Sequence, residues 1–220
     1  SADSPQMKRA HWHLLPAIEQ LTLPGALEAV RMTTKDACKL GFGGFCYEGP
    51  GYFWRRPMPQ WAVSEFTKVM AEGHTHKYSE AVTIAILESV ATVINELKWG
   101  GGPLRSDGTV DPHAMVDLLN QSSSAENLGL WIQSDNEDDV FWFTKHRAKP
   151  RRAQHLIRIT DFIRLLRGNH LIVTYINTKL NLLADLISRS YRVNESGEVV
   201  PDEKVFSEFL IECAKAGYPN

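Results

Sequence analysis

One stretch near the start of the chain, residues 30–44, constrains the fold more than any other. Apolar and polar side chains alternate over residues 30–34, which is the period of a half-buried strand. Asp36 falls where that strand should end, and the glycine-rich run 41–44 lets the chain turn back into a second strand. An aspartate at a strand end is most often a turn residue, so its meaning depends on the rest of the chain.

Length and composition predict one domain with appendages that is large enough to bury a core. The chain has 220 residues, a hydrophobic fraction of 43% and a net charge of −2, so any nucleic-acid site must come from a local basic patch. The three cysteines show no metal-binding spacing, and we expect an intracellular protein, cytoplasmic or nuclear. No apolar run is long enough to span a membrane, and we expect no membrane partner.

The hydrophobic periodicity predicts an α/β fold. Strands are expected at 29–37, 41–47, 52–56, 128–133 and 171–176. Helices are expected at 7–21, 79–94, after Pro150 in the segment 145–167, from 181 onward, and at 202–216. The helix 79–94 is apolar on most sides, which indicates burial against a sheet. Residues 99–127 form a long connection with a possible short helix at 113–120, and 193–201 is expected to be a polar loop.

Four acids fall at the ends of these predicted elements. Asp36 ends the first strand, Asp135 follows the fourth strand, and Asp185 lies near the start of the helix after the fifth strand. Glu80 would lie in the first turn of the helix that Ser79 caps, where a glutamate usually serves only the helix dipole. Together the four carboxylates can converge at one sheet edge and bind two divalent cations, which need oxygen ligands.

These segments resemble the ribonuclease H domain of reverse-transcribing retroelements, most closely that of tyrosine-recombinase-type elements. The resemblance lies in five short segments: 34–37, 41–44, 79–80, 133–136 and 173–189. Its most specific part is the run containing Asn181, Ala184, Asp185, Ser188 and Arg189. The likeness covers about residues 29–190; residues 1–28 resemble the connector helix before this domain, and 191–220 the loop and amphipathic helix after it.

The resemblance implies a ribonuclease H-like fold, a mixed five-stranded sheet flanked by helices. It also implies hydrolysis of the RNA strand of RNA–DNA hybrids, within a reverse transcriptase whose polymerase domain belongs to the same polyprotein. Position by position, Asp36, Glu80, Asp135 and Asp185 match the four metal-binding carboxylates of the family. They would hold two Mg²⁺ ions, with Mn²⁺ as a substitute.

Recognition of a hybrid would use shape and 2′-hydroxyl groups. Asn136, next to one of the acids, could read a ribose. The one dense basic run suits duplex phosphates, or it is a solvated face: Lys145, Arg147, Lys149, Arg151 and Arg152. The acidic run 137–139 is expected on the surface, and Trp131 and Trp142 in the core.

Three departures from the family bear on function. Lys35 precedes Asp36; if the strand alternates, Lys35 points away from it, lies near the sheet edge and leaves the metals alone, whereas a bulge would bring its ammonium to the acids. No histidine lies between Ile176 and Asp185, and the connection 99–127 is long. The alternatives are an inactive module that binds nucleic acid or a protein, and a transposase- or integrase-type nuclease, against which the run 184–189 speaks.

Overall fold

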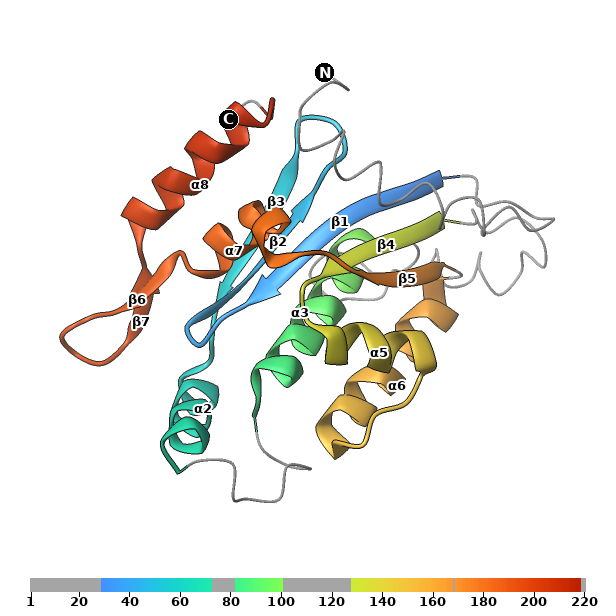
Figure 1. The fold of residues 1–220 in the computed structure, drawn as a ribbon, viewed down its shortest axis with the longest axis horizontal. Coiled ribbons are helices and arrows are strands. Elements are labelled where there is room, and N and C mark those ends of the chain that lie inside the picture. Colours follow the sequence, from blue (N-terminus) through green and yellow to red (C-terminus); the bar gives the residue numbers. More distant parts are fainter. Residues whose placement is uncertain (1–28, 73–81, 101–127, 168, 219–220) are drawn as a thin grey trace.

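The chain folds into an α/β structure with a five-stranded mixed sheet between two layers of helices (Figure 1). The computed structural model describes residues 29–72, 82–100, 128–167 and 169–218, and six α-helices fall within these ranges. The predicted helices at 7–21 and 113–120 lie outside the described residues. None of the described helices has the combined length and apolar character needed to cross a bilayer.

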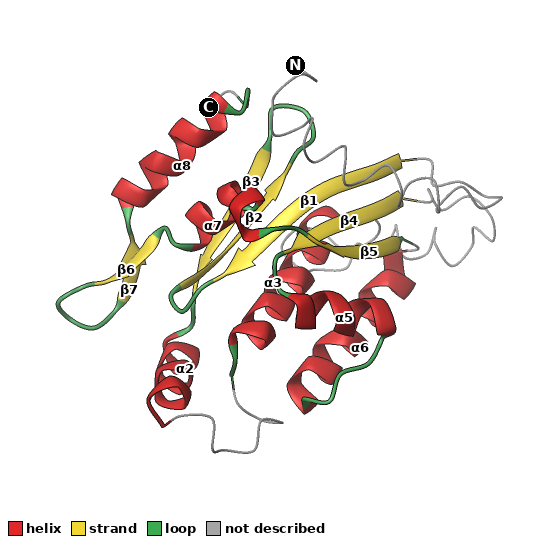
Figure 2. Cartoon of the chain, in the orientation of Figure 1, coloured by secondary structure: helices red, strands yellow, loops and turns green. Residues whose placement is uncertain are grey.

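The sheet has the order β3-β2-β1-β4-β5, with β1 in the centre (Figure 2). Its strands are β1 (Ala29–Ala37), β2 (Gly41–Cys46), β3 (Tyr52–Pro57), β4 (Leu128–Ser134) and β5 (His170–Tyr175). β2 and β3 pair in an antiparallel meander with β1, whereas β4 runs parallel to β1 and β5 parallel to β4. The carboxyl ends of β1, β4 and β5 therefore meet at one edge, and the predicted mixed five-stranded sheet is confirmed.

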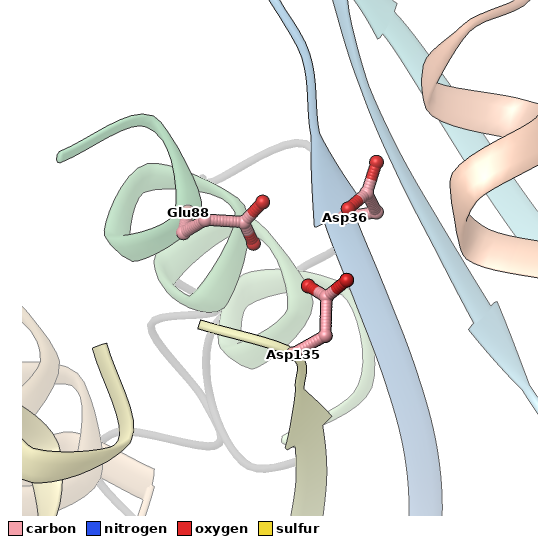
Figure 3. Close-up of side chains that lie close together, drawn as sticks. All are labelled: Asp36, Glu88 and Asp135. Carbon is pink, nitrogen blue, oxygen red and sulfur yellow. The ribbon is translucent and has the colours of Figure 1, made fainter. Parts of the chain in front are cut away.

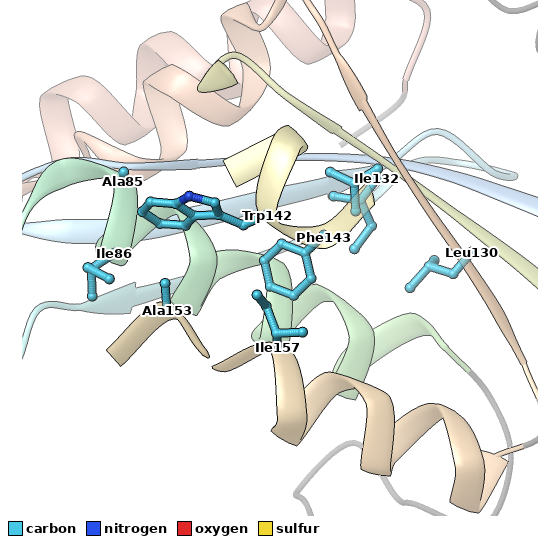
Figure 4. Close-up of a cluster of buried hydrophobic side chains, with 9 residues drawn as sticks. Ala85, Ile86, Leu130, Ile132, Trp142, Phe143, Ala153 and Ile157 are labelled. Carbon is cyan, nitrogen blue, oxygen red and sulfur yellow. The ribbon is translucent and has the colours of Figure 1, made fainter. Parts of the chain in front are cut away.

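One face of the sheet is covered by α3 (Ile84–Trp99), α5 (Glu137–Lys145) and α6 (Arg151–Arg167). Leu130 and Ile132 of β4 pack there against Trp142, Phe143 and the other buried side chains of these helices (Figure 4). The α2 helix (Gln60–Glu72) extends this core, because Ala62 joins a second cluster with Leu87 and Ala91 of α3. Burial of this apolar surface holds α3 against the sheet.

The other face carries α7 (Leu182–Ser188) and α8 (Glu203–Lys215), which follow the short 3₁₀ turn η1 (Thr178–Leu180). Phe45 of β2 packs in one cluster with Ile187 of α7 and Phe209 of α8, so the C-terminal helix shares the core of the sheet. The predicted polar loop at 193–201 contains a hairpin instead, β6 (Tyr191–Val193) and β7 (Val199–Pro201). Strands of three residues are too short to show a period.

Two glycines of β2 let elements of the opposite faces come close. A Cβ on Gly43 would lie 2.6 Å from the Ser188 nitrogen of α7, and one on Gly44 would collide with Oδ1 of Asn95 in α3. Gly43 pairs with Asp36 and Gly44 with Lys35. Because paired residues point to the same side of a sheet, Asp36 faces α7 and Lys35 faces α3.

The α3 helix begins later than predicted, and the α2 and α5 helices were not predicted. The α3 helix begins at Ile84, where the Thr83 hydroxyl accepts a hydrogen bond from the Ile86 nitrogen at 3.4 Å, rather than at 79. The α5 helix begins where the sequence predicts only an acidic surface run. That run favours a helix, because Asn136 caps it and acids in the first turn interact well with the helix dipole.

Candidate active site

Three carboxylates from three elements converge at the edge where the parallel strands end. Asp36 lies at the end of β1, Asp135 directly follows β4, and Glu88 projects from α3 toward both (Figure 3). One carboxylate oxygen from each of the three lies within 4.8 Å of the others, close enough to hold a metal ion. The parallel pairing of β1 and β4 brings the two aspartates together, and the packing of α3 on the sheet adds the glutamate.

The glutamate of this group is Glu88, whereas the sequence led us to expect Glu80. Glu80 lies outside the described residues, so its own placement stays a prediction. Glu88 is the single charged residue between positions 81 and 94, in a helix that is apolar on most sides. A lone charge in a buried helix needs a partner, and that signal in the sequence could have found it.

Glu88 is held in place at both of its oxygens. Oε1 accepts a hydrogen bond from the Ala37 backbone nitrogen at 3.0 Å, and Oε2 lies 2.7 Å from Nζ of Lys35. The same ammonium lies 2.7 Å from Oδ2 of Asp139 and 2.8 Å from Oγ of Ser134. We call Lys35, Glu88 and Asp139 the Lys35 network; its side chains are buried, with exposed fractions of 0%, 3% and 0%.

The Lys35 network corrects two expectations. The alternation of β1 is confirmed, but Lys35 lies in the central strand rather than near the sheet edge, and it contacts an acid of the cluster. Asp139 is buried rather than exposed, and it accepts hydrogen bonds from the hydroxyl groups of Ser89 and Thr92 at 2.8 and 3.0 Å. Lys35 and Asp139 can be buried because each compensates the charge of the other. They lie on different elements, so their pairing could not be read from the sequence.

Asp36 is nearly buried, and the Ser188 hydroxyl donates a hydrogen bond to its Oδ2. Burial raises the pKa of the Asp36 carboxyl well above its usual range, and the negative charges of Glu88, Asp135 and Asp185 raise it further. Burial likewise raises the pKa of Glu88, although the ammonium of Lys35 opposes that shift. Ionising these carboxylates together costs free energy through desolvation and mutual repulsion, and a bound cation would offset that cost.

Asp185 lines the same cleft from α7, but it does not belong to the group of three. Its Oδ1 accepts a hydrogen bond from Nε of Arg189 at 2.6 Å. Asn181 fixes the start of α7 on β1, because its Oδ1 accepts from the Thr34 hydroxyl and its Nδ2 donates to the Lys35 carbonyl at 3.0 Å. The Asn181 and Ser188 side chains therefore contact β1, and the Arg189 side chain contacts Asp185.

A cleft of about 540 Å³ opens over these acids. Asn136 lines it, and its Oδ1 accepts from the Asp139 nitrogen at 3.1 Å as the cap of α5, so its amide nitrogen is left to offer a ligand. Thr178 lies on the lining as well, and Lys39 and Arg189 supply positive charge there.

The predicted basic run is placed elsewhere. Its five residues span the end of α5 and the start of α6, and none of them lines the acidic cleft. Arg152 is half-buried and pairs with Glu65 of α2 at 3.0 Å, while the others are exposed: Lys145, Arg147, Lys149 and Arg151. The cations at the cleft, Lys39 and Arg189, were not singled out as nucleic-acid ligands because they are isolated in the sequence.

The chemistry of the donors fits a hard divalent cation. The lining residues that the structure describes include four carboxylates and no histidine. Cys38 also lines the cleft, but its Sγ donates to the Ser188 carbonyl at 3.3 Å, and burial raises the pKa of the thiol. A thiol that keeps its proton is a poor ligand, so the donors that this cleft offers a metal ion are carboxylate oxygens. No protein-family model, curated protein or solved structure matches this chain.

Proposed function

We propose that this chain is a metal-dependent ribonuclease H that hydrolyses the RNA strand of RNA–DNA hybrids. The observation that carries the proposal is the convergence of Asp36, Glu88 and Asp135 at one sheet edge, with Asp185 in the same cleft. Convergent carboxylates in a concave site are typical of enzymes that cleave phosphodiesters with divalent cations.

The topology supports the same proposal. An antiparallel meander followed by parallel strands that alternate with helices is compatible with the ribonuclease H-like fold that the sequence resemblance implies. The most specific motif of that resemblance, around Asp185, lies in α7 against the central strand. By the same resemblance we propose that the chain works within the reverse transcriptase of a retroelement.

The acids divide into those that are preorganised and one that is not. Asp36, Glu88 and Asp135 would hold a Mg²⁺ ion, and Asp185 would help to hold a second. Bound cations would supply Lewis-acid stabilisation of the attacking and leaving oxygens of the phosphodiester. The protein's own part is positional: Lys35 and the Ala37 nitrogen orient Glu88, and Ser188 orients Asp36.

Substrate contacts follow from the lining of the cleft. The amide nitrogen of Asn136 and the hydroxyl of Thr178 are suited to hydrogen-bond the 2′-hydroxyls that distinguish RNA from DNA. Lys39 and Arg189 are suited to phosphates. The exposed basic residues between α5 and α6 would then reach only more distant phosphates, if the duplex extends that far.

The test is incubation with Mg²⁺ and an RNA–DNA hybrid labelled in the RNA strand. We expect endonucleolytic cuts in that RNA, no cleavage of duplex RNA or duplex DNA, and no cleavage after chelation of the metal. Mn²⁺ should support the reaction. Equal cleavage of duplex RNA, or activity that survives a chelator, would contradict the proposal.

A second candidate function is a ribonuclease H-like module that binds nucleic acid or a protein without cleavage. The observation in its favour is that two of the four acids already have cationic partners, Glu88 with Lys35 and Asp185 with Arg189. Salt-dependent binding of the hybrid, with no cleavage in Mg²⁺ or Mn²⁺, would favour this module over the enzyme.

A further inference from the structure

The end of α7 contacts two of the acids through neighbouring residues. Ser188 donates to Asp36, and Arg189, the residue that caps the helix C-terminus, donates from Nε to Oδ1 of Asp185 at 2.6 Å. The hydrogen bond that Arg189 donates to Asp185 raises the pKa of the guanidinium, and the negative charges of Asp185 and Asp36 raise it further. Among the described residues that line the cleft, Arg189 supplies the one guanidinium.

The geometry separates Asp185 from the other three acids. Asp36, Glu88 and Asp135 have oxygens within 4.8 Å of one another without any rearrangement, and no oxygen of Asp185 belongs to that group. Asp185 is 23% exposed and could turn toward Asp36, but the contact with Arg189 holds it. One cation site is therefore formed in advance, whereas the second is incomplete.

We propose that Arg189 is a positioning residue that occupies Asp185 in place of a second divalent cation and thereby sets the affinity of that cation. The proposal rests on the proposed function, since it concerns the same site. A guanidinium and a divalent cation compete for the same carboxylate charge, and both cannot sit at Oδ1, so the contact with Arg189 leaves a cation only Oδ2 of Asp185. The second site therefore gains the full carboxylate of Asp185 only when Arg189 leaves it.

The ion pair between Arg189 and Asp185 can separate at low cost. The Arg189 side chain is 62% exposed, and ion pairs with this exposure contribute little stability because water solvates the separated charges well. Once released, Arg189 remains on the lining of the cleft, where a phosphate of a bound strand can take the place of Asp185. Loss of Arg189 should therefore strengthen binding of the second cation and weaken binding of the substrate.

The test is calorimetric titration of the whole chain with Mn²⁺. The wild-type protein should show one tighter and one weaker binding event, and Glu88→Gln should remove the tighter one. In Arg189→Ala the weaker event should become about twofold tighter, because an exposed ion pair of this spacing is a weak competitor for the carboxylate. The affinity of the tighter event should stay as in the wild type.

Arg192→Ala is the matched control. It removes the same charge three positions along the chain, from an exposed side chain of β6. It should leave both events as in the wild type. In cleavage assays Arg189→Ala should also lower the Mn²⁺ concentration for half-maximal rate and raise the hybrid concentration for half-maximal rate; a merely structural role would worsen both.

The outcomes separate this inference from the function it rests on. A weaker event that is unchanged in Arg189→Ala, or that tightens equally in Arg192→Ala, overturns the role of Arg189 and leaves the ribonuclease proposal standing. The expected calorimetry without hybrid cleavage supports the role of Arg189 and overturns the ribonuclease. No Mn²⁺ binding by any variant overturns both.

Discussion

Two ion pairs at the site join a basic side chain to a candidate metal ligand, and they differ sharply in burial. Lys35 contacts Glu88 from the α3 face, where the exposed fractions of the two side chains are 0% and 3%. Arg189 contacts Asp185 from the α7 face, where the fractions are 62% and 23%. The buried Lys35–Glu88 pair is therefore held in place, whereas water or a ligand can displace the exposed Arg189–Asp185 pair. We infer that the first pair builds the site and the second regulates it.

Energetics explains why the buried pair is fixed. A buried ammonium costs several kcal/mol to desolvate, and this cost is offset only when its partners stay in place. Lys35 has two carboxylate partners and the Ser134 hydroxyl, while Asp139 has two further hydroxyl donors. Removing Lys35 leaves two buried carboxylates without their cation, whereas removing one carboxylate leaves Lys35 paired with the other. The Arg189 pair carries no such penalty, because water replaces either partner.

The largest effect should follow from Lys35→Met. This change leaves Glu88 and Asp139 as buried negative charges, and we expect a loss of about 3–5 kcal/mol in the free energy of unfolding, measured by urea denaturation. Lys39→Met is the control, because Lys39 is an exposed lysine in the turn between β1 and β2. Its change should be within about 0.5 kcal/mol.

A double-mutant cycle sharpens this result. Adding Asp139→Asn to Lys35→Met removes a charge that the first change stranded, so the double variant should regain part of the lost stability. If the effects of Lys35→Met and Asp139→Asn simply add, the two side chains do not interact and the Lys35 network does not exist as described.

The next effect concerns activity and the choice between two glutamates. Glu88→Gln removes a candidate cation ligand while keeping its shape, and it should slow hybrid cleavage by more than about a hundredfold, beyond the loss typical of outer-shell partners. Glu80→Gln should cleave at nearly the wild-type rate in the same assay. The reverse pattern would restore the assignment that the sequence suggested and would remove Glu88 from the site.

A smaller effect, opposite in sign, is expected for Asp36→Asn in the absence of metal. The folded-state pKa of Asp36 is raised, so stability is fully present below the unfolded pKa of about 3.9 and is lost as pH rises toward the folded pKa. At neutral pH the neutral Asn should stabilise the protein by about 1 kcal/mol or more, since a tenfold change in proton affinity is worth about 1.4 kcal/mol. Thermal unfolding at pH 4 and pH 7 measures this gain.

The control for this prediction is the metal itself. Saturating Mg²⁺ should raise the melting temperature of the wild type more than that of Asp36→Asn, because only the wild type has the full ligand set. A gain for Asp36→Asn that is equal at pH 4 and pH 7 would show that charge repulsion is not its cause.

The sequence was sufficient for the sheet and for two of the three clustered acids. The alternation in β1, the glycines of β2 and the apolar run of β4 each report on a local period, so those strands could be predicted nearly to the residue. Asp36 and Asp135 follow from their positions at strand ends. Glu88 was missed because a predicted helical start at 79 favoured the first glutamate, although the position of Glu88 as a lone charge in an apolar helix was a local signal for it.

The Lys35 network could not be predicted from local patterns. Lys35, Glu88 and Asp139 lie on three elements, and each is an ordinary surface residue type by composition. Only the packing of α3 and α5 on one face of β1 brings them together, and that packing depends on tertiary contacts such as those of Trp142 and Phe143. The run 137–139 was likewise expected on the surface, because nothing local shows that the packing of α5 buries Asp139.

The smallest effect should come from Arg189→Ala, and it completes the comparison with Lys35. The pair spans one helical turn at the end of a seven-residue helix, and most of the Arg189 side chain is in water. Exposed pairs with this spacing contribute about 0.3–0.5 kcal/mol, so the free energy of unfolding should fall by no more than about 0.5 kcal/mol. Raising the salt concentration should shrink even that difference, because exposed charges are screened. A loss approaching that of Lys35→Met would mean that Arg189 holds α7 on the sheet, and the guanidinium could not then leave Asp185 at the low cost that a displaceable partner requires.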